Sequence, residues 1–222
     1  MSVKLNADKL GVNQKKLSEI KNLIFDLGGV IVDVDVELFN KSFQDIGFTN
    51  FTDIYSQIKQ SSLFELFETG KIQPQFFRNE LRKFKNNLSD SQIDSAWNSV
   101  IVKVPDQNIE LLINLRKNYK TFVLSNTNII HMDFLTDKLI SNLGKNPFEE
   151  MFDHVYLSYE IGYRKPDKEC FQYVLDKAGI NAGETIFIDD LIENVKGASN
   201  AGIFGYQLID RNLVDLFYEK EM

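Results

Sequence analysis

The chain contains 222 residues, of which 43% are hydrophobic and 26% are charged. This is the composition of an ordinary globular protein, and it excludes the fibrous and intrinsically disordered classes. At this length the chain can bury a sizeable core, either as one domain with an insertion or as two small domains.

The charge balance limits the kinds of partner that the protein can bind. With 25 Lys and Arg against 32 Asp and Glu, the formal net charge is −7. Duplex nucleic acid requires a basic face that displaces counterions from phosphates, so we expect no nucleic-acid partner. No stretch approaches the roughly 20 apolar residues of a membrane helix, and the N-terminus has no apolar signal segment. Cys170 is the single cysteine and suits a reducing compartment. We therefore expect a cytoplasmic protein without a membrane partner.

The first elements along the chain are a weak segment and then a buried strand. Residues 1–20 show no strong periodicity, although Leu10, Leu17 and Ile20 could line a weak helix. The apolar run at residues 23–25 lacks polar alternation, as strands that are buried on both faces do.

A long helical segment separates this strand from the next apolar run, which begins only at Thr121. A crossover with its helix needs only a few tens of residues, so an insertion must lie between the two strands. Helical spacing starts at Val36 and stops at Gly47, and it returns after Pro74. A capping box formed by Ser89 and Gln92 starts a further helix. These patterns predict a small helical bundle.

The remaining patterns alternate between strands and helices. Strands are predicted at residues 121–124, 155–157, 185–188 and 204–209, and helices at 106–118, 171–178 and 192–201. This alternation predicts a doubly wound, mainly parallel α/β sheet of Rossmann-like type. The expected division is an N-terminal extension at 1–20, an α/β core at 21–34 and 101–222, and a helical cap at 35–100.

Chemically coherent side chains follow the predicted strands. In an open parallel sheet the ligand crevice lies at the carboxyl ends of the strands, so these side chains should share one edge. They are three carboxylates, a hydroxyl, an amide and a lysine, namely Asp26, Ser125, Asn126, Lys165, Asp189 and Asp190. Such a set fits a divalent cation that neutralises the acids and a phosphate that lies between the cation, the lysine and the hydroxyl.

This chemistry assigns a role to each residue. Asp26 is the natural nucleophile and would form an aspartyl-phosphate. Ser125 and the amides near Asn126 would hold phosphoryl oxygens, and Lys165 would neutralise charge during transfer. Mg²⁺ would be bound by Asp26, Asp190, the carbonyl of Gly28 and water molecules. Asp189 would be a further ligand or would hold one of these ligands in place. Asn194 could orient the carboxylate of Asp190.

Four motifs, at residues 25–30, 124–128, 164–166 and 188–194, carry a resemblance to a known family. The order of the motifs and the helical insertion resemble those of the haloacid dehalogenase superfamily of hydrolases. The motif sequences are most similar to those of its bacterial α-D-glucose-1-phosphate phosphatase group. The resemblance implies a magnesium-dependent phosphatase with a mobile cap, which acts on a small phosphomonoester such as a sugar phosphate.

One position departs from the pattern of the superfamily. Its phosphatases usually carry a second Asp two positions after the nucleophile, where this chain has Gly28. Loss of a general acid-base lowers a rate by about 10²- to 10⁴-fold, although the glucose-1-phosphate phosphatase group shares this gap. Candidate replacements are three carboxylates at the entry to the insertion, Asp33, Asp35 and Glu37. Two histidines are also candidates, and His131 is a better candidate than His154.

Two alternatives to a phosphatase stay open. A 2-haloacid dehalogenase-like hydrolase is possible because a halide leaving group needs no proton, and a phosphate-binding protein that has lost turnover is possible because of Gly28. Glu65, Glu68 and Arg78 in the insertion are candidate specificity residues, whereas Arg164 is expected to be a solvated loop residue. The oligomeric state is not determined by these patterns.

Overall fold

The protein is described here by a computed structural model that covers residues 2–11, 17–48, 62–209 and 212–220. In this part of the chain, a five-stranded parallel sheet has the order β6-β5-β2-β7-β8. Its strands are β2 (Asn22–Phe25), β5 (Lys120–Ser125), β6 (His154–Leu157), β7 (Thr185–Asp189) and β8 (Phe204–Gln207). The predicted parallel α/β sheet is therefore confirmed.

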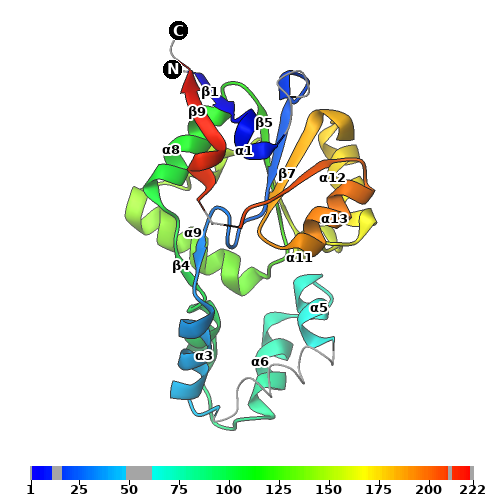
Figure 1. Cartoon of the computed structure of the whole chain (residues 1–222). Helices are drawn as coiled ribbons and strands as arrows, with labels where there is room; N and C mark the ends of the chain where they lie inside the picture. Colours follow the sequence, from blue (N-terminus) through cyan, green and yellow to red (C-terminus); the bar gives the residue numbers. More distant parts are fainter. Residues whose placement is uncertain (1, 12–16, 49–61, 210–211, 221–222) are drawn as a thin grey trace.

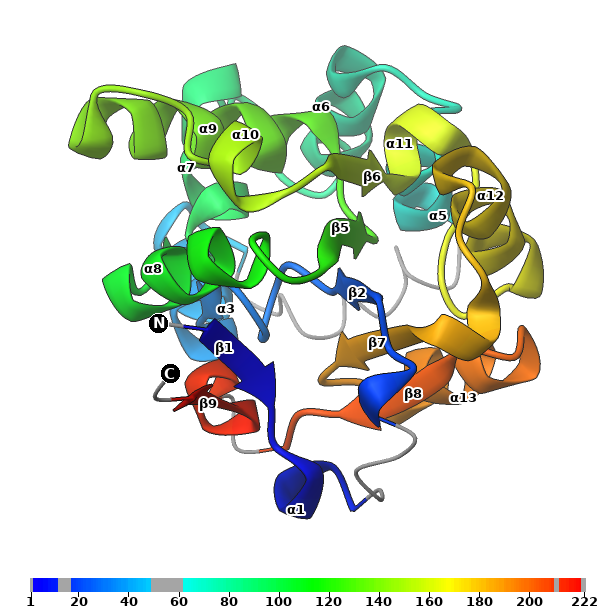
Figure 2. The same ribbon diagram turned by 90° about the horizontal axis from the view of Figure 1, so that it is seen from above.

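The central strands are apolar because helices cover both faces of the sheet. All residues of β2 and β7 are buried, and so are all residues of β5 after Lys120. Figure 2 shows α8, α9 and α10 on one side of the sheet and α12 and α13 on the other. These helices are α8 (Asp106–Leu115), α9 (Ile129–Leu143), α10 (Phe148–Met151), α12 (Lys168–Ala178) and α13 (Ile192–Asn200). The short helix α11 (Ser158–Ile161) follows β6.

A helical insert forms a second body below the sheet (Figure 1). It contains α3 (Val36–Asp45), α5 (Leu63–Glu68), α6 (Pro74–Arg82) and α7 (Asp90–Asn98). The insert has its own aromatic core, in which the rings of Phe67 and Phe77 stack with centroids 4.3 Å apart. The predicted capping box of Ser89 and Gln92 is formed at the start of α7. The predicted helical insertion is thus present, while the residue boundaries of the three-part division stay a prediction.

A two-stranded stem joins the insert to the sheet. The strands β3 (Asp33–Val34) and β4 (Ile101–Lys103) pair antiparallel, and the Asp35 amide donates to the carbonyl of Val100 at 2.9 Å. Neither strand is predicted by the sequence pattern, because segments of two or three residues carry no measurable periodicity. The stem brings the two ends of the insert together close to the carboxyl end of β2.

The N-terminal segment contains a strand as well as helical turns. The strand β1 (Ser2–Leu5) pairs antiparallel with β9 (Phe217–Lys220), and the short helix α1 (Ala7–Leu10) follows it. The expectation of a weak helix missed β1 because its alternation of buried Val3 and Leu5 with exposed Lys4 is too short to recognise. Leu10, Leu17 and Ile20 are buried, but residues 12–16 lie outside the described chain. Two 3₁₀ turns complete the described elements, η1 (Ala182–Glu184) and η2 (Leu213–Leu216).

Candidate active site

Three carboxylates meet at the carboxyl edge of the sheet. Asp26 directly follows β2, Asp189 is the last residue of β7, and Asp190 comes next. Because β2 and β7 are neighbouring parallel strands, their ends deliver these side chains to one place. One oxygen atom of each carboxylate lies within 4.8 Å of the others. The acidic cluster expected from the sequence is therefore brought together by the fold.

Lys165 lies between two of these carboxylates. Its Nζ is 2.7 Å from Asp26 Oδ1 and 2.7 Å from Asp189 Oδ2, and the residue is only 1% exposed. The ammonium also lies 5.2 Å from the centroid of the Phe187 ring. Burial by itself lowers the pKa of Lys165, but the attraction of the two carboxylates outweighs burial, and the pKa is raised above its usual value. Lys165 is therefore a fixed positive charge inside the site.

The negative charge of the cluster exceeds the positive charge that Lys165 supplies. Burial is the largest influence on Asp26 and raises its pKa to about 6; the ammonium of Lys165 opposes this shift, and the charge of Asp189 adds to it. Buried carboxylates in excess of their cationic partners are costly unless a further cation neutralises them. The oxygen-only donor set fits Mg²⁺, which prefers oxygen ligands and uses few protein carboxylates.

Both carboxylate oxygens of Asp189 accept hydrogen bonds from other groups of the protein. The residue is fully buried, and its Oδ1 accepts from the amide of Leu191 at 2.8 Å. The Asn194 side chain donates to both carboxylate oxygens at 3.1 and 3.0 Å, and Lys165 binds Oδ2. The expectation that Asn194 orients Asp190 is therefore corrected. Because α13 begins only at Ile192, Asn194 is not one helical turn beyond Asp190.

Asp190 is half-buried and depends on a glycine opposite to it. Gly29 has φ +77°, and a Cβ at this position would lie 2.5 Å from Asp190 Oδ2. Both the left-handed backbone and the close approach of the carboxylate therefore require glycine here. Unlike Asp189, Asp190 is not fully buried, so its carboxylate is the more accessible of the pair.

The loop after β5 joins the site from the other side of β2. Ser125 is the last residue of β5 and is 4% exposed. The side-chain oxygen of Asn126 accepts from the amide of Lys165 at 2.8 Å, and its nitrogen donates to the carbonyl of Lys165 at 2.8 Å. This side chain, for which the sequence analysis expected a substrate-binding role, thus holds the backbone of Lys165 in place. A phosphate contact at Asn126 would have to come from its backbone amide.

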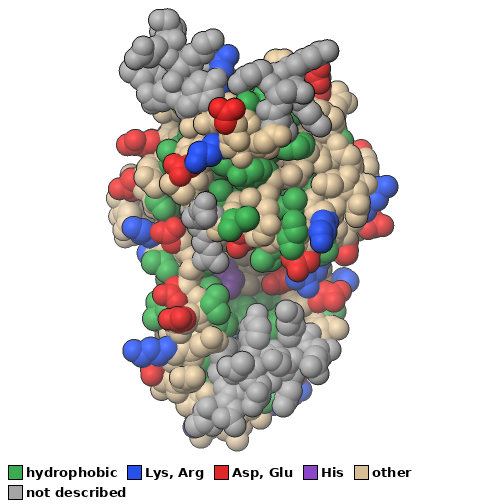
Figure 3. Space-filling view, in the orientation of Figure 1, with side chains coloured by type: hydrophobic (Ala, Val, Ile, Leu, Met, Phe, Trp, Pro, Cys, Tyr) green, Lys and Arg blue, Asp and Glu red, His purple; other side chains and the backbone are tan. Residues whose placement is uncertain are grey.

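A small cavity lies beside this loop, between the sheet and the insert. Its volume is about 160 Å³, and Gly28, Ser125, Asn126 and His131 are among its lining residues. The other walls are mainly apolar and come from the stem, the end of the insert and α9, with Val34, Val100, Ile101, Met132 and Leu135 among them. Figure 3 shows the molecule hollowed at the level between the sheet and the insert, with a histidine side chain visible there.

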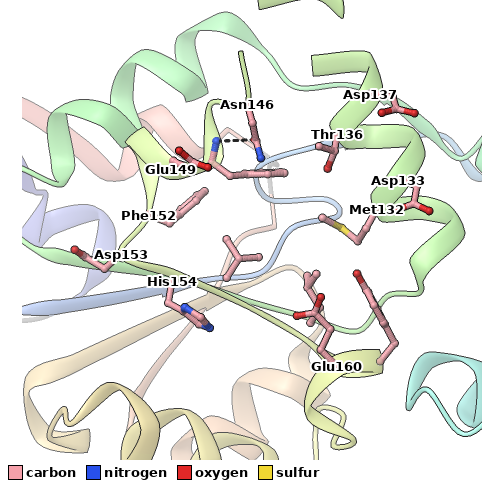
Figure 4. A pocket seen from close by; sticks show the side chains of 14 residues that line it. Met132, Asp133, Thr136, Asp137, Asn146, Glu149, Phe152, Asp153, His154 and Glu160 are labelled. Atoms are coloured by element: carbon pink, nitrogen blue, oxygen red, sulfur yellow. Dashed lines mark hydrogen bonds between the residues drawn. The ribbon is translucent and has the colours of Figure 1, made fainter. Parts of the chain in front are cut away.

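A larger pocket of about 600 Å³ lies elsewhere, between α9 and β6 (Figure 4). Its lining includes His154 and several carboxylates, Asp133, Asp137, Glu149, Asp153 and Glu160. It contains none of the acidic cluster, Lys165 or Ser125. Of the two, the smaller cavity is the one lined by residues predicted from the sequence for the site, namely Gly28, Ser125 and Asn126.

The candidate specificity residues of the insert have different positions. Glu68 at the end of α5 pairs with Arg164, with 2.9 Å between Oε2 and Nη2. Arg164, which was expected to be a solvated loop residue, thus contacts the insert directly beside Lys165. Arg78 donates two hydrogen bonds of 2.8 Å to Asp94 and so stabilises the insert internally. Glu65 is exposed.

The candidate replacements for the missing acid lie in different parts of the structure. Asp35 caps α3 and accepts from the amide of Leu38 at 2.8 Å, and Glu37 is exposed in the first turn of that helix. Asp33 lies in the stem strand β3. His154 is exposed on β6, whereas His131 lines the cavity at the sheet edge.

Comparison with known proteins agrees with this combination of fold and site. The sequence matches the family of haloacid dehalogenase-like hydrolases over residues 20–202. The chain belongs to this family of hydrolase enzymes. It is 31% identical to a D-ribitol-5-phosphate phosphatase of Bacteroides thetaiotaomicron, over 85% of this chain and 91% of that protein. It is 33% identical to a sesquiterpene phosphatase of Aspergillus oryzae, over 86% of this chain and 90% of that protein.

Solved structures show the same fold. An enzyme of this family from Bacteroides thetaiotaomicron, in complex with magnesium and inorganic phosphate, has a TM-score of 0.78 and is 40% identical. The match covers 85% of this chain and 93% of that one. An L-2-haloacid dehalogenase of Xanthobacter autotrophicus has a TM-score of 0.59 at 19% identity, which shows a common fold alone. Within the described residues, no helix has the length and apolar character needed to cross a membrane.

Proposed function

We propose that the protein is a magnesium-dependent phosphatase that hydrolyses a small phosphomonoester, a sugar or polyol phosphate, through a phospho-aspartate on Asp26. One observation carries the proposal, namely the position of Lys165 between Asp26 and Asp189, with Asp190 beside them. An excess of buried carboxylates over one ammonium supports a cation site next to a nucleophilic carboxylate. The similarity to phosphatases over most of the chain supports the same reaction.

The residues present fit Mg²⁺. Asp26, Asp190 and the carbonyl of Gly28 would hold it together with waters, and Asp189 would act indirectly by holding Lys165. The bound cation would neutralise the carboxylates and the phosphate, so that an anionic substrate can approach an acidic site. The relative solved with magnesium and phosphate supports this cofactor.

The side chains of the site then support a two-step transfer. A carboxylate oxygen of Asp26 attacks the phosphorus atom, and the bond from phosphorus to the ester oxygen breaks as the alcohol leaves and takes up a proton from a water molecule. Lys165 compensates the charge that moves between the carboxylate and the phosphoryl group, and Ser125 and nearby backbone amides hold phosphoryl oxygens. Water then attacks the aspartyl-phosphate, which releases phosphate and restores Asp26.

The size of the cavity favours a small leaving group. The volume of about 160 Å³ corresponds to about five water molecules at about 30 Å³ each. Ribitol 5-phosphate, on which a relative acts, has a short polyhydric leaving group of the same order of size. Glucose 1-phosphate, which the sequence motifs suggested, stays a second substrate to be tested, and the cytoplasmic location and the lack of a nucleic-acid partner also stay predictions.

The test is phosphate release from a panel of phosphomonoesters that includes ribitol 5-phosphate and glucose 1-phosphate, with and without Mg²⁺. We expect release that requires Mg²⁺ and that falls by at least about 10³-fold in Asp26→Asn, because an amide is a poor nucleophile. Asp176→Asn, which changes an exposed carboxylate on α12, is the matched control and should keep its activity.

Other outcomes would select one of the alternatives. Full activity in Asp26→Asn would show that the nucleophile is assigned wrongly. Magnesium-dependent binding of phosphate esters without product would indicate the binding protein, and chloride release from 2-chloropropionate without phosphatase activity would indicate the dehalogenase.

A further inference from the structure

The end of the insert and the start of α9 are joined by a polar cluster, which we call the α7–α9 contact. It consists of Trp97 and Asn98 from α7 together with Asn128 and His131 from the sheet side. The indole Nε1 of Trp97 donates to Asn128 Oδ1 at 3.3 Å, and the same oxygen caps α9 by accepting from the amide of His131 at 3.1 Å. The rings of Trp97 and His131 are parallel, with centroids 5.1 Å apart. The orientation of the imidazole is therefore set by residues of the insert.

The hydrogen bond to Asn98 determines which nitrogen of His131 carries the proton. Nδ1 lies 2.9 Å from Asn98 Oδ1, and this amide oxygen can only accept. The proton must therefore be on Nδ1, which leaves a lone pair on Nε2. Among the described residues, no hydrogen bond to Nε2 is formed, so this atom is available to a ligand.

His131 lies at the wall of the small cavity beside the loop after β5. His131 lines the cavity of about 160 Å³ together with Gly28 and Ser125. Because Ser125 at the end of β5 lines the cavity, we expect a phosphate held at Ser125 to have its ester group in this cavity. The opposite walls are mainly apolar, so a polar group on His131 gives the leaving group a specific direction.

The protonation state of His131 determines whether its imidazole can donate a proton or only accept a hydrogen bond. Burial lowers the pKa of the imidazole to about 3, so the ring is neutral at neutral pH. A neutral ring with its proton on Nδ1 cannot protonate a leaving oxygen through Nε2, but it can accept a hydrogen bond there. His131 is therefore suited to binding a hydroxyl group and not to replacing the acid that is missing at Gly28.

We propose that Nε2 of His131 accepts a hydrogen bond from a hydroxyl group of the substrate's leaving group, and that Asn98 and Trp97 are positioning residues for this contact. The enzyme would then select phosphate esters of short polyhydric alcohols over esters whose leaving group has no hydroxyl. This inference rests on the proposed phosphatase function and specifies its substrate class. Because two of the four residues belong to the insert, the recognition site is complete only when the insert lies against the sheet.

Two substitutions of His131 separate the roles of its nitrogens. His131→Asn keeps a polar group near the position of Nδ1 and removes Nε2, whereas His131→Gln can place an acceptor near the position of Nε2. The matched control is His154→Asn, because His154 is the other histidine of the chain and is exposed on β6. All three variants are made in the full-length protein and tested with Mg²⁺ present.

The first readout is turnover of ribitol 5-phosphate relative to p-nitrophenyl phosphate, whose leaving group has no further hydroxyl. We expect the ratio of the two kcat/KM values to fall about tenfold in His131→Asn, as for the loss of one hydrogen bond to the substrate. The ratio should recover largely in His131→Gln and stay at the wild-type value in His154→Asn. An equal loss on both substrates, or an unchanged ratio, would overturn the proposal.

The second readout does not need turnover. In the Asp26→Asn background, calorimetry measures the affinity for ribitol 5-phosphate relative to inorganic phosphate. We expect His131→Asn to weaken binding of ribitol 5-phosphate about tenfold more than binding of phosphate. Equal weakening of both ligands would overturn the inference. A selective loss in this binding assay, combined with no phosphate release by the protein with Asp26 intact, would instead contradict the proposed function and leave the recognition by His131 standing.

Discussion

At the scale of single residues, the neighbouring Asp189 and Asp190 differ because the strand ends between them. Asp189 is the last residue of β7, is fully buried, and has both oxygens bound by Lys165, Asn194 and the amide of Leu191. Asp190 lies outside the strand and is only half-buried. We infer that Asp189 holds Lys165 in place, whereas Asp190, in the same acidic cluster, is a ligand of the cation.

Asparagine at each of these positions should therefore give different losses. Asp189→Asn should lower the free energy of unfolding by about 3 kcal/mol, because it breaks a buried ion pair and leaves Lys165 with Asp26 alone. Asp190→Asn should cost less stability than Asp189→Asn, because Asp190 is only half-buried, but it should abolish the rise in Tm that Mg²⁺ causes. Urea unfolding without metal and thermal unfolding with Mg²⁺ measure the two effects. Equal losses in both experiments would contradict the division of roles.

At the scale of elements, the described residues of the insert meet the sheet side through the stem and at two further places. One is the α7–α9 contact, and the other lies between α5 and α11. At the second contact Glu68 pairs with Arg164, and a Cβ at Gly70 would lie 2.2 Å from the carbonyl oxygen of Tyr159. Gly70 also has φ +69°, so the chain at this contact requires glycine. These contacts hold the insert over the acidic cluster.

The ion pair between Glu68 and Arg164 should favour the closed arrangement of the insert. Glu68→Ala and Arg164→Ala should each raise KM about three- to fivefold, and the double variant should be no worse than either single one. The coupling should be about 1 kcal/mol or less, because the two side chains are 22% and 33% exposed and water screens them.

A double-mutant cycle on kcat/KM measures this coupling. The control is Arg116→Ala, which breaks a surface ion pair with Asp153 on the sheet side of the molecule. Additive effects of the two substitutions at Glu68 and Arg164 would show that the pair does not hold the insert.

At the scale of the whole molecule, a protein of net charge −7 concentrates buried carboxylates where we propose that it binds a phosphate. Lys165 cannot balance Asp26, Asp189 and Asp190, and burial raises the pKa of Asp26 to about 6. The charge of the site thus depends on a bound cation and on pH together. Metal binding, substrate binding and protein stability should therefore be linked.

This linkage predicts how the effect of Mg²⁺ on stability depends on pH. Below about pH 6 Asp26 carries a proton that it must lose to bind the cation, so the affinity for Mg²⁺ falls by up to about tenfold per pH unit there. At a fixed, sub-saturating MgCl₂ concentration, Tm should rise clearly at pH 7.5 and much less at pH 5.

Thermal unfolding at both pH values checks this, with NaCl of equal ionic strength as the control for screening. Asp26→Asn should show no step near pH 6, because the titrating group is absent. An equal rise in Tm at pH 5 and pH 7.5 would contradict the link between Asp26 and the cation.

The sequence by itself determined the elements whose signal is local. Buried apolar runs predicted β2, β5, β6, β7 and β8, and helical spacing predicted the insert and three of the helices that cover the sheet. The rule that ligands bind at the carboxyl ends of parallel strands predicted that Asp26, Ser125 and Asp189 lie close together. The predictions of strands and helices need only the residues near each position in the chain, because periodicity reports which face of an element is buried.

Only the tertiary structure decided the contacts between distant segments. It showed that Asn194 binds Asp189 and not Asp190, that Asn126 holds the backbone of Lys165, and that Arg164 meets the insert. It also paired β1 with β9 across almost the whole chain and placed His131 against Trp97. The partner of each polar group depends on how the elements pack, and packing is set by the sum of many small contacts that no short stretch of sequence contains.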